Sequence, residues 1–322
     1  MSELHKFLFE GLPVRGMIVR LTDAWQEILA RRRADDAASP WPWPVTRMVG
    51  EMAAAGVLMQ SNIKFNGALV MQIFGEGPVK VAVAEVQPDL SLRVTAKVVG
   101  EVAGDAHLQD LVNVNGRGRC AITLDPKDRV PGQQAYQGVV PLNATYGAGQ
   151  PSLADVLEHY MRQSEQLDTK LVLAADNDVA AGLLIQRLPA EGKGNIEGSG
   201  EPMDAAEQLE HFNRIATLAS SLTAEELLRL DVETILRRLF WQEKILRFDP
   251  QTPRFACTCS RERVAGMIRG LGQEEAESIL AERGEIDVSC DFCGQHYRFD
   301  AVDSAQIFTA PGDRPPASST VQ

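Results

Sequence analysis

Three features that define large classes of protein are absent or scarce in this 322-residue sequence, and the first is a long apolar run. No stretch is apolar for long enough to span a bilayer, so we expect no membrane partner. The N-terminus, MSELHKFLFEGLPVRG, lacks the basic start, apolar run and small-residue cleavage site of a secretory signal. Together these absences predict a cytoplasmic protein.

Positive charge and histidine are scarce as well. The sequence has 32 Lys and Arg against 44 Asp and Glu, which gives a formal net charge of -12 at pH 7. Binding to phosphate backbones requires a basic surface, so we expect no nucleic-acid partner. The five histidines are widely scattered and form no convincing set of nucleophile, base and orienting residue. We therefore do not expect an enzyme.

Cysteine is the third scarce residue, yet four of the five cysteines lie in two tight pairs. The pairs are FACTCS at 255–260 and SCDFCG at 289–294. In a reducing cytosol such pairs are more often metal ligands or redox centres than structural disulfides. Thiolates on tight turns can share one zinc ion, whose tetrahedral shell accepts four sulfurs. The predicted zinc ligands are Cys257, Cys259, Cys290 and Cys293.

The remaining cysteine and a nearby histidine are interpreted differently. Cys120 lies in GRGRCAITL, a predicted strand, and is interpreted as a buried core thiol rather than a sensor. His296 follows Cys293 by three residues and is a competing donor, but four cysteines already complete a tetrahedral shell. We expect neither residue to bind the metal.

The spacing leaves two interpretations of the zinc site open. In the first, zinc is a structural clip that contributes on the order of 10 kcal/mol to the folding of a module with little core of its own. In the second, the site is a redox switch, because a module that depends on its metal unfolds when oxidation converts the thiolates to disulfides. A C-x-x-C pair closes into a disulfide more readily than a C-x-C pair, whose small loop is strained.

The first 190 residues predict an α+β domain, because helical patterns alternate with antiparallel strand signals. Ser152 is expected to cap one of these helices, with Asp155 three residues later. The expected elements are a buried helix at 43–61, a strand meander at 63–86, a strand pair at 119–126 and 135–142, a helix at 151–167 and a hairpin at 171–189.

Composition divides the rest of the chain. EGKGNIEGSGEP, at 191–202, is Gly-rich and polar, which indicates a flexible joint. Two helices are predicted across 203–245, and the second begins at Thr223, forms a capping box with Glu226 and continues to Phe240. The expected domains are an α+β core at 1–190, a joint and helical linker at 191–249, a zinc-binding domain at 250–303 and a disordered tail at 304–322.

The cysteine pairs are separated by further helical signals. Ser260 is a plausible N-cap for RERVAGMIRG, and Gly284 a C-cap for QEEAESILAERG. EIDVSC reads as a strand that leads into the second cysteine turn, where Gly294 supplies a permissive backbone. This order of elements differs from that of a thiol oxidoreductase, whose C-x-x-C pair lies at a helix start near a βαβ unit.

Several segments resemble the redox-regulated chaperones called heat shock protein 33. The C-T-C at 257–259 and RERVAGMIRGLGQEEAESILAERGEIDVSCDFCGQHYRFDAVD at 261–303 resemble that family's zinc module. Four other segments resemble the N-terminal domain of that family, namely RGMIVRLTDAWQEIL, IKFNGALVMQIFGEGPVKVAVAE, YQGVVPL and ADVLEHYMRQSEQLDTKLVLA. The resemblance thus covers nearly the whole chain.

The resemblance implies an ATP-independent holdase that is inactive while reduced and zinc-bound. Oxidation would pair Cys257 with Cys259 and Cys290 with Cys293, release zinc and unfold a linker at 200–245. Oxidised members dimerise through the N-terminal domain and bind unfolding client proteins. The apolar surface that we expect to be released comprises Leu209, Phe212, Ile215, Leu227, Ile235, Leu239, Phe240 and Trp241.

A simpler interpretation of these eight residues, here called the apolar stripe, is ordinary core packing. In the reduced state, core packing and a later release as a client-binding surface can both hold. The competing function is a zinc-clipped structural protein or a zinc ribbon that binds nucleic acid. Residues 251–300 carry six Arg or Lys against nine Asp or Glu, and this acidic balance disfavours a surface that follows phosphates.

Overall fold

The structure is a computed structural model that describes residues 1–34, 39–128, 134–143, 150–188 and 204–309. The chain divides into two compact units, Met1–Ala30 with Pro40–Ala256 and Arg31–Ser39 with Cys257–Gln322. Both units combine helices with antiparallel strands, so the predicted α+β class is confirmed. No helix in the described ranges is both long and apolar enough to cross a membrane.

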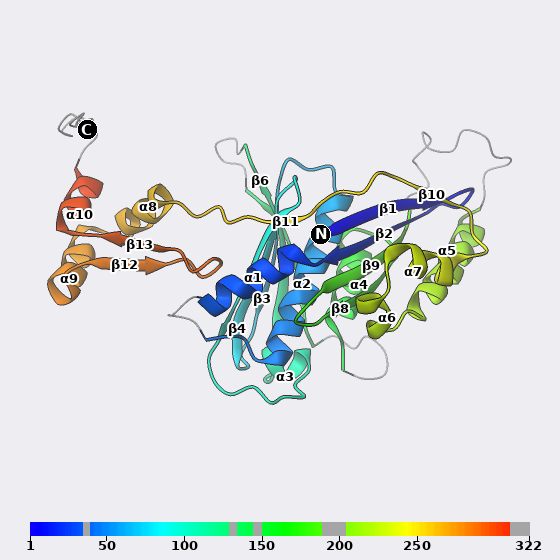
Figure 1. The fold of residues 1–322 in the computed structure, drawn as a ribbon, viewed down its shortest axis with the longest axis horizontal. Coiled ribbons are helices and arrows are strands. Elements are labelled where there is room, and N and C mark those ends of the chain that lie inside the picture. The colour runs from blue at the N-terminus through cyan, green and yellow to red at the C-terminus, as the bar shows by residue number, and fades with distance from the viewer. Residues whose placement is uncertain (35–38, 129–133, 144–149, 189–203, 310–322) are drawn as a thin grey trace. The chain divides into compact units, whose positions relative to one another are not determined.

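Two sheets form the framework of the first unit (Figure 1). The five-stranded sheet has the order β10 (Ile245–Arg247), β1 (Glu3–Phe9), β2 (Val14–Leu21), β9 (Ala180–Arg187) and β8 (Thr169–Ala175). The six-stranded sheet has the order β11 (Arg254–Phe255), β5 (Ser91–Val98), β4 (Val79–Val86), β3 (Gly67–Phe74), β6 (Arg119–Pro126) and β7 (Tyr136–Pro141). All these pairings are antiparallel except that of β11 with β5. The predicted meander, strand pair and hairpin are therefore confirmed.

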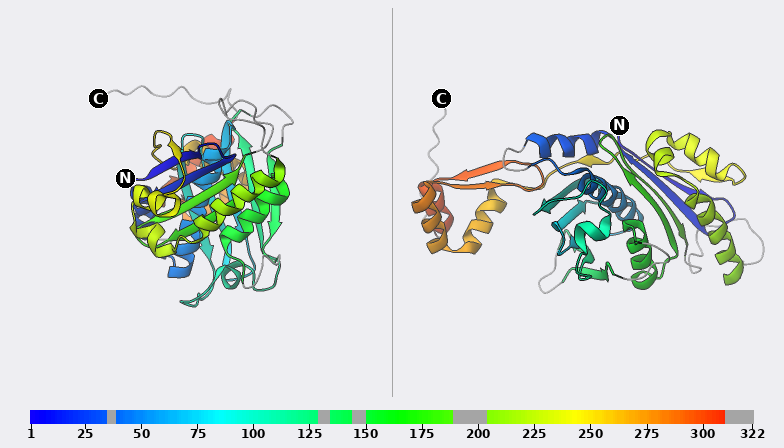
Figure 2. Two further views of the ribbon diagram at one scale, coloured as in Figure 1. Left: turned by 90° about the vertical axis from the view of Figure 1, so that its right-hand side faces the viewer. Right: turned by 90° about the horizontal axis from the view of Figure 1, so that it is seen from below.

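Helix α2 (Trp43–Asn62) lies between the two sheets (Figure 2). It contacts β8 and β9 of one sheet and β4 and β5 of the other. A helix that is covered on both sides must be apolar around most of its circumference, and the Ala- and Met-rich sequence of α2 meets this requirement. The predicted buried helix at 43–61 is thus confirmed.

The first unit also contains α3 (Leu108–Val112), α4 (Leu153–Ser164) and the larger part of α1 (Asp23–Ala34), whose residues from Arg31 onward belong to the second unit. The start of α4 is capped as predicted, since the Asp155 N–H donates to the Ser152 hydroxyl at 3.3 Å and the Asp155 carboxylate accepts from the Ser152 N–H at 2.9 Å. Helix α4 contacts β8 and β7, one strand from each sheet.

Helices α5 (Ala205–Ser220), α6 (Ala224–Arg229) and α7 (Val232–Phe240) contact each other or the five-stranded sheet, as the right-hand view of Figure 2 shows. The capping box of Thr223 and Glu226 is confirmed. The prediction of one continuous helix from Thr223 to Phe240 is wrong. The backbone is extended at Leu230, and the Asp231 side chain accepts from the Thr234 N–H at 2.9 Å. Asp231 therefore starts a second helix, because its carboxylate offers the backbone a local alternative to helical bonding.

The chain after α7 adds a strand to each sheet, which the sequence did not indicate. β10 pairs with β1, and β11 pairs with β5. These pairings satisfy backbone groups on two strands that would otherwise be edges. Residues 250–256 consequently belong to the first unit, whereas the expected zinc-binding domain began at 250. The predicted Gly-rich joint at 191–202 lies outside the described residues.

The second unit contains α8 (Arg261–Leu271), α9 (Gln273–Arg283), the hairpin of β12 (Ile286–Ser289) and β13 (His296–Phe299), and α10 (Ala301–Phe308). The predicted caps at Ser260 and Gly284 are confirmed, and Gly284 has the left-handed φ of 79°. Among its described residues the core is small, and its buried apolar residues are Ile268, Ala276, Ile286, Phe299 and Ile307.

Helix α10 crosses the predicted boundary at residue 303. Residues 304–308 are helical, so the expectation of a disordered tail from 304 is wrong for them. Asp300 starts this helix, because its side chain accepts from the Asp303 N–H at 2.8 Å, and Ile307 is buried in the core of the unit. Residues 310–322 lie outside the described part of the chain.

The close approach of α2 to β8 can be tested at Gly50. A Cβ at this position would lie 2.4 Å from the Ala175 Cβ and 3.1 Å from the Trp25 ring. We expect Gly50→Ala to lower the free energy of unfolding by about 1–3 kcal/mol, because the added methyl overpacks the core. The measurement is urea denaturation, with Gly104→Ala as the control, since a Cβ at Gly104 meets nothing within 4 Å. Equal stability of Gly50→Ala and the unaltered protein would contradict this packing.

Candidate metal centre

The first cysteine pair lies on the extended stretch that precedes α8. Ser260 ends this stretch as the N-cap of the helix, and its hydroxyl accepts from the Arg263 N–H at 3.3 Å. The Arg263 guanidinium also donates to the hydroxyl of Thr258 at 2.8 Å. These two bonds order the backbone on both sides of Cys259.

The second cysteine pair lies in the tight turn between β12 and β13. The N–H groups of Cys293 and Gly294 both donate to the Cys290 carbonyl, at 3.2 and 2.8 Å. The Cys290 N–H in turn donates to the Gln295 carbonyl at 3.0 Å. Gly294 has a φ of 69°, a left-handed conformation that favours glycine, so the permissive backbone predicted there is confirmed.

The fold brings the four predicted sulfur atoms together. All four Sγ atoms lie within 4.8 Å of one another. The Cys257 and Cys290 sulfurs are 3.7 Å apart, and those of Cys259 and Cys293 are 3.4 Å apart. A tetrahedral zinc site with Zn–S bonds of ~2.3 Å requires sulfurs about 3.8 Å apart. The cluster therefore fits a four-coordinate metal ion of this size.

The electrostatics of the cluster favour a bound cation. Hydrogen bonding to Cys257 and burial raise the pKa of the Cys290 thiol, and burial raises the pKa of Cys293 to about 11. Neighbouring thiols thus oppose one another's ionisation. A divalent cation reverses this preference, because it stabilises several thiolates at once.

Tyr297, which sequence reasoning missed, contacts the cluster. Its hydroxyl donates to the Cys259 sulfur at 3.1 Å, and this bond raises the pKa of Tyr297 to about 12. A hydroxyl donor next to a ligating sulfur orients the ligand and disperses its charge. The signal available in the sequence was the strand-like alternation of HYRF at 296–299, which follows the second cysteine pair.

His296 and Cys120 are placed away from the cluster. His296 Nδ1 lies 2.9 Å from an Asp287 carboxylate oxygen, and His296 is not among the residues that form the cluster. Cys120 is fully buried on β6 in the core of the first unit, and burial raises the pKa of its thiol to about 12. The interpretation of Cys120 as a core thiol is confirmed.

Arg261 links three elements of the second unit next to this cluster. Its guanidinium lies 4.2 Å above the Phe299 ring and donates to the Arg298 carbonyl at 2.7 Å. It also forms an ion pair with Asp303 of α10, at 2.7 Å. These contacts supplement the small apolar core, but a unit of this size still has little surface to bury.

The apolar stripe lies in the first unit, and most of it is buried. Leu209 and Trp241 are exposed, at 40% and 73% of their accessible surface. The other six belong to a single buried cluster under the five-stranded sheet and comprise Phe212, Ile215, Leu227, Ile235, Leu239 and Phe240. The structure therefore separates the predicted stripe into a packed set and two exposed residues.

The sheet residues that cover the stripe were missed by sequence reasoning. The Phe240 ring lies edge-on to Phe9, with 5.0 Å between ring centroids, and 6.3 Å from Phe7. The Arg20 guanidinium donates to the carbonyls of Leu227 and Leu228 at 2.5 and 3.1 Å. The short apolar runs FLF in β1 and MIV in β2 were the available signal, because strands that are buried on both faces lose the alternation with polar residues.

Fold and site together define a two-unit α+β protein with a cluster of four cysteines, able to hold a metal ion, in its smaller, C-terminal unit. The family model described as Hsp33 protein matches residues 2–300. The chain therefore belongs to the Hsp33 family, which is a family of chaperones.

Relatives that are named 33 kDa chaperonin support this assignment along the whole chain. The protein of Chromobacterium violaceum is 43% identical over 307 residues, which cover 95% of this chain and 94% of that protein. That of Methylobacillus flagellatus is 42% identical over 309 residues, or 96% and 94% of the two chains. The crystal structure of the 33 kDa chaperonin from Thermotoga maritima matches with a TM-score of 0.72 and 19% identity, over 95% of this chain and 97% of that one. This last match shows the shared fold.

Metal binding by the cluster can be tested at Cys290. We expect Cys290→Ser to weaken zinc binding by more than about a hundredfold, because a hydroxyl is a poor substitute for a thiolate in the zinc shell. The measurement is competition for zinc against a colorimetric chelator, with the protein kept reduced. Cys120→Ala is the control, since it also removes a thiol but lies outside the cluster. Unchanged zinc affinity in Cys290→Ser would exclude the predicted ligand set.

Proposed function

We propose that the protein is a redox-regulated, ATP-independent holdase that is inactive while reduced and zinc-bound. The observation that supports this proposal best is the cluster of four cysteine sulfurs, which follows in the sequence a segment whose helices bury an apolar stripe. The clients are unfolding or aggregation-prone proteins in the cytoplasm. The protein binds them and catalyses no reaction.

Zinc and thiol chemistry supply the switch. When bound, zinc holds the four cysteines as thiolates and crosslinks the two segments that carry them. In each pair, two thiolates lose two electrons and form one disulfide, while one hydrogen peroxide takes up these electrons and two protons and leaves as two waters. Two equivalents of peroxide thus produce the pairs Cys257–Cys259 and Cys290–Cys293. Disulfide sulfurs no longer act as thiolate ligands, so zinc is released.

The small core of the second unit makes it dependent on this crosslink. A unit whose described core has five buried apolar residues gains little free energy from burial, whereas structural zinc contributes on the order of 10 kcal/mol. Loss of the metal therefore unfolds the zinc-binding domain. The effect reaches the first unit through the chain, because only Ala256 separates β11 from Cys257.

The linker at 200–245 has the properties of a segment that unfolds next. Helices α6 and α7 have six and nine residues, and isolated helices shorter than about 12–15 residues are marginal in water. Their stability depends on packing against the five-stranded sheet. Release exposes the packed residues of the stripe and the sheet face beneath them, which together form an apolar surface for clients. We further propose that the oxidised protein forms a homodimer.

The alternative is a zinc-clipped structural protein or a zinc module that binds nucleic acid. The acidic balance of the zinc-binding segment argues against a phosphate-binding surface. We therefore propose that nucleic acid is not a partner.

The proposal is tested by the thermal aggregation of an unrelated client without nucleotide. Light scattering is measured with reduced protein and with protein treated with peroxide, while a chelator dye reports released zinc. We expect protection only after oxidation, and we expect it to rise together with zinc release. Zinc loss without protection would support the structural clip instead.

The role of the linker is tested by Leu227→Ala. Leu227 is fully buried in the cluster, so the variant should lose about 2–5 kcal/mol of packing and protect the client partly without oxidant. The matched control is Leu209→Ala, which makes the same change at an exposed position. Client protection that stays strictly dependent on oxidation in both variants, despite a measured loss of stability in Leu227→Ala, would contradict release of the linker.

A further inference from the structure

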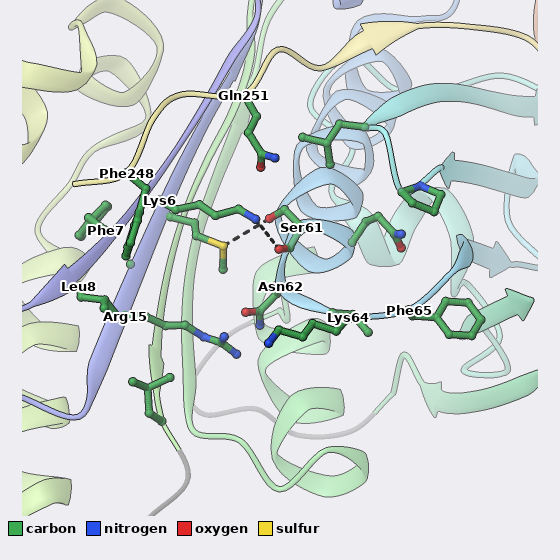
Figure 3. Close-up of a pocket in the computed structure, with 17 residues that line it drawn as sticks. Lys6, Phe7, Leu8, Arg15, Ser61, Asn62, Lys64, Phe65, Phe248 and Gln251 are labelled. Carbon is green, nitrogen blue, oxygen red and sulfur yellow. Dashed lines mark hydrogen bonds between the residues drawn. The ribbon is translucent and has the colours of Figure 1, made fainter. Parts of the chain in front are cut away.

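A pocket of about 490 Å³ lies in the first unit, which does not contain the cysteine cluster (Figure 3). Its walls come mainly from β1 and β2, the end of α2 with the residues that follow, the connection between β4 and β5, and residues after β10. Volumes of roughly 300–1,000 Å³ are typical of sites that hold a small ligand. Nothing in the proposed holdase function uses this pocket.

The charged residues that line the pocket are all cationic. Lys6 lies on β1, Arg15 on β2 and Lys64 in the segment after α2, and no Asp or Glu is among the described residues that line the pocket. Figure 3 shows the Arg15 guanidinium and the Lys64 ammonium turned toward one another, while the Lys6 ammonium lies at Ser61. Three separate segments thus bring like charges to one pocket, in a chain whose net charge is -12.

The two partly buried cations have neutral partners. Lys6 donates to the Ser61 carbonyl at 2.7 Å, and Arg15 donates to the Gln186 side-chain oxygen at 3.1 and 2.5 Å. Burial lowers the pKa of both groups, and repulsion from Arg15 lowers the pKa of Lys6 further. Within the described ranges, no ion pair joins Lys6, Arg15 or Lys64 to a carboxylate. An anion in the pocket would offset both the burial and the mutual repulsion.

The three cations keep N–H groups that a ligand can use. A guanidinium has five N–H groups and an ammonium has three. The bonds of Arg15 to Gln186 use two of the five, and the bond of Lys6 to Ser61 uses one of the three. Lys64 is exposed, so its ammonium can adjust to a bound ligand. The remaining donors suit the oxygens of a carboxylate or a phosphate, because the negative charge of such an acceptor strengthens each hydrogen bond.

The rest of the pocket lining is mostly apolar. Ile63 and Phe248 line the pocket and are both exposed, and Leu8 and Leu188 line it half-buried. An apolar group that covers these side chains is favoured, because it removes their surface and its own from water. Neither a bare anion nor a neutral apolar molecule would use both parts of the lining. A matching ligand therefore combines an anionic head group with an apolar body.

We propose that this pocket binds a small amphiphilic anion whose carboxylate or phosphate head group lies among Lys6, Arg15 and Lys64. The apolar body of the ligand covers Ile63 and Phe248. Carboxylates and phosphates share the negatively charged oxygens that the three cations recognise, and direct binding measurements distinguish the two head groups. Binding at this site needs neither oxidation nor the release of zinc, so it does not depend on the proposed holdase switch.

The test uses the reduced, zinc-bound full chain and isothermal titration calorimetry with octanoate and octyl phosphate. Octanamide, which has the apolar body without the charge, and acetate, which has the charge without the body, are the comparison ligands. We expect the tighter of the two amphiphilic anions to bind at least about tenfold more tightly than either comparison ligand, because only an amphiphilic anion contacts both parts of the lining. The tighter anion also identifies the preferred head group. Octanamide or acetate binding as tightly as that anion, or no binding of octanoate and octyl phosphate, would overturn the proposal.

Variants locate the binding in the pocket. Lys6→Met should weaken binding of the tighter anion about tenfold or more, while Lys97→Met, which removes an exposed lysine of β5 outside the pocket lining, should not change it. Lys64→Glu guards against a folding defect in Lys6→Met, because Lys64 is exposed. It should weaken binding by at least about fivefold, through repulsion of the anionic head group. Unchanged affinity in either variant, with its fold intact by circular dichroism, would overturn the proposal.

Discussion

The first unit depends on covering both faces of its five-stranded sheet. Strands β1, β2 and β9 carry apolar residues on each face, so neither face can be left in water without a large cost in free energy. Helix α2 covers one face and forms part of the main core together with the six-stranded sheet. Helices α5, α6 and α7 cover the other. The two coverings differ in kind, because α2 is one long helix between two sheets whereas the others lie on the outside, and two of them, α6 and α7, are short.

This difference connects the fold with the function of the family. A long helix between two sheets is part of the core that both sheets share, whereas the packing between the sheets does not include the helices on the outer face. The proposed release of these outer helices is therefore compatible with an intact main core. Among the described residues, the polar bonds that hold them include those from Arg20 to the carbonyls at the end of α6 and the ion pair of Arg229 with Asp176 at 3.0 Å. An apolar sheet face under such a cover is consistent with the proposed holdase function, which requires an apolar surface that is hidden in one state and exposed in the other.

Local sequence signals predicted most elements of the chain. Capping residues predicted the starts of helices correctly at Ser152, Thr223 and Ser260. A side chain that accepts a hydrogen bond from a backbone N–H acts within one helical turn, so the signal is local in the sequence. The same chemistry explains the error at Asp231, whose capping bond divides a pattern that looked like one helix. Strands β10 and β11 were missed because they are short and have little strand signal of their own. Pairing with β1 and β5 is what holds them in an extended conformation.

The sequence by itself determined the class of the fold, the four cysteines of the candidate metal site and the family. The two tight cysteine pairs indicated the candidate metal site, the helix and strand patterns indicated the fold class, and the resemblance of several segments indicated the family. The tertiary structure decided which residues meet across long distances in the chain. It placed Phe9 against Phe240, the Tyr297 hydroxyl on Cys259, and Lys6 and Arg15 in one pocket with Gln60 and Asn62. Such contacts join elements far apart in the sequence, and their partners are set by the packing of whole sheets and helices rather than by any local preference.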